Sequence, residues 1–75
     1  MKNNTINDLN LINEKYKDLI KQGCSRIGSA KESINLILGY GVHIYIYKDE
    51  YDEPIYIEID GILLLFGYGI YKKVI

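Results

Sequence analysis

The fold is decided by residues 55–66, which read IYIEIDGILLLF. Aliphatic residues occupy every second position in the first half, a period of two that is typical of a strand with one buried face. Asp60-Gly61 follows at once, and Asp-Gly between two apolar runs is the strongest short signal for a two-residue hairpin turn. We therefore predict two antiparallel strands, Ile55–Ile59 and Ile62–Phe66, joined by a tight turn.

Two further strands are predicted on either side of this hairpin. Upstream, Val42–Tyr47 alternates aliphatic residues with His or Tyr, and downstream Ile70–Ile75 is a candidate fourth strand. One register keeps the aliphatic sides together in both hairpins, and a slip of one residue would spoil both. That register places Tyr47 opposite Tyr56, Tyr45 opposite Glu58, His43 near Asp60 and Ile55 opposite Phe66.

The register gives the predicted sheet two unlike faces. The first is apolar throughout and consists of Val42, Ile44, Ile46, Ile55, Ile57, Ile59, Ile62, Leu64 and Phe66. The second carries His43, Tyr45, Tyr47, Tyr56, Glu58, Leu63 and Leu65. No remaining element of the chain is long enough to cover this second face, so we expect it to face solvent or another chain.

A first helix is predicted from about Ile6 to Gln22. Its apolar residues recur at helical spacing and form one stripe. Thr5 and Asp8 have the spacing of a capping box at its start. Gly23 stands where a left-handed C-terminal cap belongs.

A second, shorter helix is predicted to begin at the capping box Ser29–Glu32 and to end at Gly39 or Gly41. The short connector favours an antiparallel helix pair. Both helices would pack on the aliphatic face of the sheet. The predicted fold is therefore α+β, with two N-terminal helices on one face of a three- to four-stranded antiparallel meander sheet, ααβββ(β).

Length and composition predict a single domain over residues 1–75, with a frayed or disordered tail at 1–4, a helical pair at 5–38 and the sheet at 42–75. The single cysteine, Cys24, allows no intrachain disulfide. The start of the sequence has no apolar signal segment. The longest apolar stretch, 62–71, is too short for a membrane helix. We expect a cytoplasmic protein without membrane contact.

The sequence offers little catalytic chemistry. His43, Glu58 and Asp60 form the only polar cluster that different strands would bring together, and no Ser or Cys is placed beside them to be activated. The Gly-Tyr-Gly segments at 39–41 and 67–69 lack the three glycines between strand and helix that a dinucleotide loop needs. We therefore predict no enzyme, no cofactor and no metal site.

The charge balance argues against a nucleic-acid partner. The net charge is −1, whereas a protein that binds phosphates normally carries a basic stripe. Aromatic side chains on a sheet can stack single-stranded bases, but their neighbours here are Glu58 and Asp60 rather than Lys or Arg. The acidic segment Asp49–Glu53 lacks the spacing of a calcium loop and is interpreted as a solubilising hairpin tip.

The second face of the sheet carries the strongest functional signal. Tyrosine combines a large apolar body with a hydroxyl group and few rotamers, so it is enriched at binding surfaces. Tyr45, Tyr47 and Tyr56 beside Leu63 and Leu65 form a patch larger than a monomer usually exposes. We predict a small non-enzymatic binding module that forms a homo-oligomer. It would act through this face on a host protein or on a small aromatic ligand such as a nucleotide.

Composition favours one source and leaves two alternatives open. Ile, Asn, Lys and Tyr make up about half of the chain, a bias of AT-rich genomes that favours an inhibitor or sequestering protein from a phage or another mobile element. In the first alternative, the chain is a structural subunit whose tyrosines become buried on self-association. In the second, it is a small hydrolase with a pocket that gathers His43, Glu58 or Asp60 with a nucleophile or metal.

Overall fold

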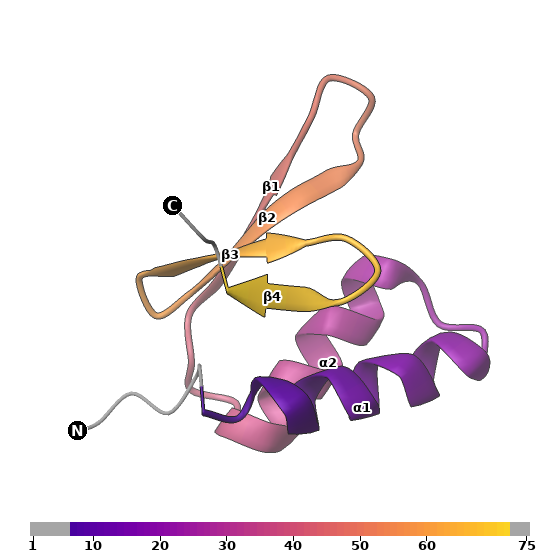
Figure 1. Cartoon of the computed structure of the whole chain (residues 1–75), viewed down its shortest axis with the longest axis vertical. Helices are drawn as coiled ribbons and strands as arrows, with labels where there is room; N and C mark the ends of the chain where they lie inside the picture. The colour runs from indigo at the N-terminus through magenta and orange to yellow at the C-terminus, as the bar shows by residue number, and fades with distance from the viewer. Residues whose placement is uncertain (1–6, 73–75) are drawn as a thin grey trace.

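Two helices precede a four-stranded antiparallel sheet in a computed structural model that describes residues 7–72 (Figure 1). The elements are α1 (Leu9–Lys21), α2 (Arg26–Leu38), β1 (Ile44–Lys48), β2 (Pro54–Ile59), β3 (Ile62–Phe66) and β4 (Ile70–Lys72). The sheet order is β1-β2-β3-β4, so each strand pairs with its neighbours in sequence. The predicted α+β fold is confirmed. The predicted tail at 1–4 and the end of the fourth strand at 73–75 lie outside the described residues.

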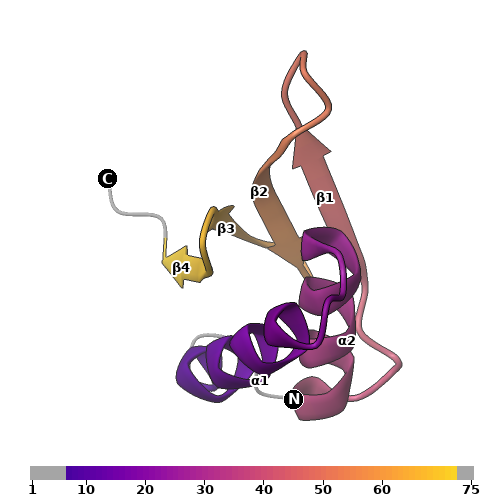
Figure 2. The ribbon, with the colours of Figure 1, turned by 90° about the vertical axis from the view of Figure 1, so that its right-hand side faces the viewer.

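The helices lie together on one side of the sheet, and α2 runs back across α1 (Figures 1 and 2). Apolar side chains fill the space between the two layers. The buried core consists of Leu9, Ile12, Tyr16, Ala30 and Ile34 from the helices, and of Ile57, Ile59, Leu64, Phe66 and Ile70 from the sheet. Burial of these side chains provides the main driving force for folding.

The strand register agrees with the prediction from alternation. Tyr45 pairs with Glu58 and Tyr47 with Tyr56 in the first hairpin, and Ile59 pairs with Ile62 in the second. Asp60 and Gly61 have φ values of 47° and 88°. Positive φ at both central residues is the mark of a type I′ turn, whose twist matches the flanking strands.

One residue predicted for the aliphatic face does not belong there. The pairing shifts after Tyr47, so that Lys48 lies opposite Pro54 instead of Ile55. The extra residue of such a β-bulge reverses the alternation of side chains beyond it. Pro54 is consequently buried and Ile55 is 40% exposed. Ile55 therefore has no place in the core, and the predicted pairing of Ile55 with Phe66 is not part of the β2–β3 ladder.

The start of α1 also differs from the prediction. The helix begins at Leu9, and Asp8 at its N-terminus makes no side-chain capping bond. Thr5, the other half of the predicted capping box, lies outside the described residues. The predicted C-terminal signal is confirmed, since Gly23 follows the helix with a φ of 95°.

The start of α2 lies three residues before the predicted capping box. Ser25 is the N-terminal cap, and its Oγ accepts a hydrogen bond of 3.0 Å from the Gly28 amide. A Cβ at position 28 would lie 2.9 Å from that oxygen, so glycine makes room for the cap. Ser29 is fully buried in the helix and does not cap it. The prediction of a shorter second helix is therefore wrong, since both helices have 13 residues; α2 ends at Leu38 with Gly39, one of the two predicted ends, as its C-terminal cap.

Strand β4 is tied to α1 by one side chain. The Asn13 amide donates to the Ile70 carbonyl over 2.9 Å, and its carbonyl accepts from the Ile70 N–H over 2.8 Å. These are the two hydrogen bonds that a further strand would supply at this edge. Glycine at position 69 leaves room for two side chains, because a Cβ there would lie 2.6 Å from the Tyr71 hydroxyl oxygen and 3.0 Å from the Asn13 oxygen.

Candidate interaction surface

The face of the sheet opposite the helices carries a continuous group of aromatic, apolar and polar side chains, which we call the tyrosine face. It consists of His43, Tyr45, Tyr47, Tyr56, Glu58, Leu63, Leu65 and Tyr71. The first seven are the predicted binding residues. The strand pairing places six of them on this face, and His43, which precedes β1 and is bonded to Asp60, continues the alternation of β1. Tyr71 was missed by the sequence reasoning. Its pairing with Leu65 places it on the same side of the sheet.

Large apolar side chains on the tyrosine face remain open to solvent. Tyr45 is 62% exposed, Tyr71 48%, Tyr47 40%, Leu65 39% and Leu63 36%. The helices cannot cover them, because both pack against the opposite side of the sheet. A contiguous apolar surface of this kind marks interaction sites more often than ordinary monomer surface.

The rings of the tyrosine face are held in place by one another and by a carboxylate. Tyr45 and Tyr47 meet edge to face, with ring centroids 4.7 Å apart and planes at 71°. The Tyr47 hydroxyl donates a hydrogen bond of 2.7 Å to Glu58. This bond to a carboxylate favours the neutral phenol and raises the pKa of Tyr47 above its ordinary value of 10.0. Three neighbouring side chains are thereby pre-positioned before any partner arrives.

The polar cluster at one end of this face takes part in the strand pairing. The Asp60 carboxylate accepts a hydrogen bond of 2.9 Å from the His43 backbone N–H, and so holds the residue before β1 against the β2–β3 turn. A hollow of about 240 Å³ beside it is lined by His43, Ile44, Tyr45, Glu58 and Gly61. This lining includes neither Ser nor Cys, and within residues 7–72 no group of three or more His, Cys, Asp or Glu side chains is placed to hold a metal ion.

Strand β1 supplies an open edge next to the tyrosine face. In the sheet as described, β1 pairs on one side only, with β2. The Asp60 N–H donates to the His43 carbonyl over 2.9 Å. Because hydrogen-bonded and non-bonded pairs alternate in an antiparallel ladder, the backbone groups of Tyr45 then point to β2, and those of Ile44 and Ile46 point to the free edge. An extended segment of another chain can pair there.

A second hollow lies on the helix side of the molecule and shares no residue with the tyrosine face. It has a volume of about 420 Å³ and is lined by Tyr16, Lys17, Ile20, Lys21, Arg26 and Tyr68. We call it the basic pocket. Sequence reasoning missed it, because its walls come from the end of α1, the start of α2 and the β3–β4 turn. Only the tertiary fold brings these three segments together.

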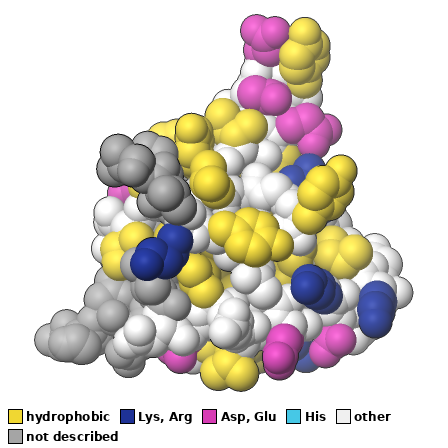
Figure 3. Space-filling model, viewed as in Figure 1, with side chains coloured by type: hydrophobic (Ala, Val, Ile, Leu, Met, Phe, Trp, Pro, Cys, Tyr) yellow, Lys and Arg dark blue, Asp and Glu magenta, His cyan; other side chains and the backbone are white. Residues whose placement is uncertain are grey.

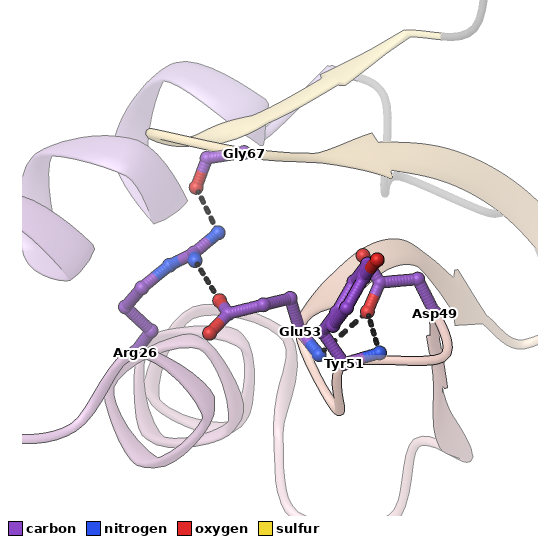
Figure 4. Close-up of polar contacts among 5 residues, drawn as sticks. All are labelled: Arg26, Asp49, Tyr51, Glu53 and Gly67. Atoms are coloured by element: carbon purple, nitrogen blue, oxygen red, sulfur yellow. Dashed lines mark hydrogen bonds and ion pairs between the residues drawn. The ribbon is translucent and has the colours of Figure 1, made fainter.

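Arg26 fixes the start of α2 against the sheet (Figure 4). Its guanidinium forms an ion pair of 3.2 Å with Glu53, donates to the Gly67 carbonyl over 2.9 Å, and lies 5.4 Å from the centre of the Phe66 ring. The same figure shows Asp49 accepting from the backbone amides of Tyr51 and Glu53, at 2.8 and 3.0 Å. The acidic hairpin tip is thus ordered by Asp49 and fastened to α2 through Glu53.

Comparison with protein-family models, with curated proteins and with solved structures gave no match. Within the described residues, neither helix is long and apolar enough to cross a membrane.

Proposed function

We propose that the chain is a small non-enzymatic binding module whose working surface is the tyrosine face. One observation carries this proposal: Tyr45, Tyr47, Leu63, Leu65 and Tyr71 stay between 36 and 62% exposed, although they lie side by side on one sheet. Folding accounts for the opposite face of the sheet, which the helices bury. Binding to the surface of another protein would explain why the tyrosine face carries apolar side chains that folding leaves exposed.

The chemistry of the tyrosine face suits a protein partner. Tyr rings bury a large area with few rotamers to freeze, and their hydroxyl groups remain able to hydrogen-bond. The contacts of Tyr47 with Tyr45 and Glu58 lower the ordering cost further, because these side chains are already positioned. The open edge of β1 adds backbone hydrogen-bonding groups that would set the direction of an extended partner segment.

The finer proposal is a homo-oligomer from a phage or another mobile element that inhibits or sequesters a host protein in the cytoplasm. The size of 75 residues and the Ile-, Asn-, Lys- and Tyr-rich composition support it. A purely structural subunit is the competing proposal for the same face. In that case further copies of this chain would cover the tyrosines and leave no surface for a host protein.

Native mass spectrometry of the protein purified from its own host tests the proposal. We expect the chain to carry the mass of at least one further polypeptide. Masses that are multiples of 8.7 kDa alone would favour the structural subunit, and a different added mass would favour a host partner. A bare monomer at every concentration would contradict both.

A further inference from the structure

The basic pocket combines an apolar floor with a positively charged rim. Tyr16 is 3% exposed and is anchored by an edge-on contact with Phe66, with centroids 5.9 Å apart. Ile20 lies one helical turn further along α1 and continues the floor. Tyr68, in the β3–β4 turn, is 94% exposed and forms a wall. The cavity therefore offers mainly the exposed surfaces of Ile20 and Tyr68 to a ligand, over the buried Tyr16 ring, with few polar groups inside.

The residues that line the basic pocket include three cations and no carboxylate, although Glu14 and Asp18 stand three residues before Lys17 and Lys21 on the same helix. Lys17 and Lys21 stand one turn apart on α1, and neither forms an ion pair with another residue in the described part of the chain. Arg26 is the third cation of the lining, and Glu53 balances it. Figure 3 shows this side of the molecule, where Lys and Arg side chains (dark blue) lie beside hydrophobic ones (yellow), with Asp and Glu side chains (magenta) next to them, over the C-terminal end of α1. Two lysines thus remain available to an anion.

We propose that the basic pocket binds an organic anion with a flat apolar body, such as an aromatic carboxylate. The body would lie between Tyr16, Ile20 and Tyr68, and the charged group would meet Lys17 and Lys21 at the mouth. A volume of about 420 Å³ is within the usual range of small-molecule sites, roughly 300–1,000 Å³. This site is separate from the tyrosine face and does not depend on the function proposed for that face.

The ligand needs both its negative charge and its apolar ring system. An inorganic anion would meet two exposed lysines in high dielectric, an attraction that water and salt largely screen. A neutral aromatic compound would gain the apolar floor without the attraction of the lysines. A nucleotide fits less well, because the polar edges of its base would lose water without finding hydrogen-bonding partners on an apolar floor. The pocket is best matched by one molecule that carries both an apolar ring system and a negative charge.

NMR titration of the ¹⁵N-labelled full chain with 2-naphthoate tests this proposal. We expect saturable shifts confined to the amides around Ile20, Lys21 and Tyr68. The uncharged analogue 2-naphthalenemethanol lacks the negative charge, and acetate lacks the apolar ring system. Each should bind at least about fivefold more weakly than 2-naphthoate, a difference in binding free energy near 1 kcal/mol. The variant Tyr45→Ala with Tyr47→Ala, which alters only the tyrosine face, should bind naphthoate as the wild type does.

Matched charge variants decide whether the lysines select the ligand. Lys17→Gln with Lys21→Gln should weaken naphthoate binding about fivefold. Lys15→Gln with Lys31→Gln removes the same charge outside the pocket and should leave binding unchanged. Equal binding of naphthoate and 2-naphthalenemethanol, or equal loss in both double variants, would overturn the proposal.

The same NMR experiment would also detect a different occupant of the basic pocket, namely the acidic hairpin tip of a second copy of the chain. The acidic hairpin tip projects from the body of the molecule (magenta, top of Figure 3), and its Glu50 and Tyr51 are exposed. If the tip of a second copy fills the pocket, the pocket amides will shift with protein concentration, and Glu50→Lys will abolish that shift. This result would overturn the assignment to a small organic anion.

Discussion

At the scale of single residues, the Asn13 side chain forms the two backbone hydrogen bonds that an additional strand would form at the edge of β4. Its amide group satisfies both the N–H and the carbonyl of Ile70. Asn13→Ala should therefore destabilise the fold by about 1–3 kcal/mol, because two partly buried backbone groups lose their partners. Urea unfolding followed by circular dichroism measures this change. Asn10→Ala, at an exposed position of the same helix, is the control and should change stability by less than about 0.5 kcal/mol.

The Tyr47–Glu58 hydrogen bond makes a prediction about pH. Since it raises the pKa of Tyr47 above 10.0, its contribution to stability is complete below pH 10 and is lost as the pH rises through the raised pKa. Glu58→Gln should return the Tyr47 pKa toward its ordinary value. Titration of the ¹³Cζ signals of labelled tyrosines measures it.

Tyr40 supplies the control for this titration. Its hydroxyl donates to Glu32 over 3.1 Å, and this bond raises the pKa of Tyr40 in the same way. Glu58→Gln should leave the Tyr40 pKa raised, and Glu32→Gln should leave the Tyr47 pKa raised. If Tyr47 still titrated late in Glu58→Gln, the hydrogen bond would not be the cause of its shift.

At the scale of elements, the bulge in the first hairpin decides which isoleucines belong to the core. Ile57→Asp would place an unpaired charge at a fully buried position and should unfold the domain, since that cost exceeds the usual stability of a small protein. Ile55→Asp should cost only about 1 kcal/mol, because the bulge turns that side chain outward. Thermal unfolding followed by circular dichroism distinguishes the two variants. Equal loss of structure in both would show that Ile55 is a core residue.

The same elements show which features can be predicted from sequence. Asp60-Gly61 and the alternation around it fixed the register correctly, because turn chemistry and side-chain parity are local properties. The bulge at Ile55 was not predictable, since it depends on how the Asp49-ordered tip meets the strands. The predicted cap of α2 lies four residues after the true one, because glycine at position 28 disfavours a helix by propensity, whereas here it makes room for the Ser25 oxygen.

The same reasoning applies to the two surfaces. Seven residues of the tyrosine face followed from strand parity alone, and Tyr71 was missed because the short β4 has too few residues to show alternation. The basic pocket could not have been predicted from the sequence. Lys17 and Tyr68 are 51 positions apart, and no periodic pattern relates them.

At the scale of the whole molecule, the sheet separates a buried core from a surface that folding leaves open. The helices, the Asn13 contact and the Arg26 contacts all lie on the core side or at the edges of the sheet. They hold the strands in place while the tyrosine face remains uncovered. The central prediction is that another polypeptide covers this face.

Native mass spectrometry of three forms of the chain, each purified from its own host, tests this prediction. The forms are the wild type, the double variant Tyr45→Ala/Tyr47→Ala, and the double variant Tyr40→Ala/Leu36→Ala. The last is the control, because it removes a similar exposed area away from the tyrosine face. All three should be folded by circular dichroism. We predict that the added mass is present in the wild type and the control and is lost in the Tyr45/Tyr47 variant. Retention of that mass in the Tyr45/Tyr47 variant, or a wild type without added mass, would contradict the assignment of the tyrosine face as the binding surface.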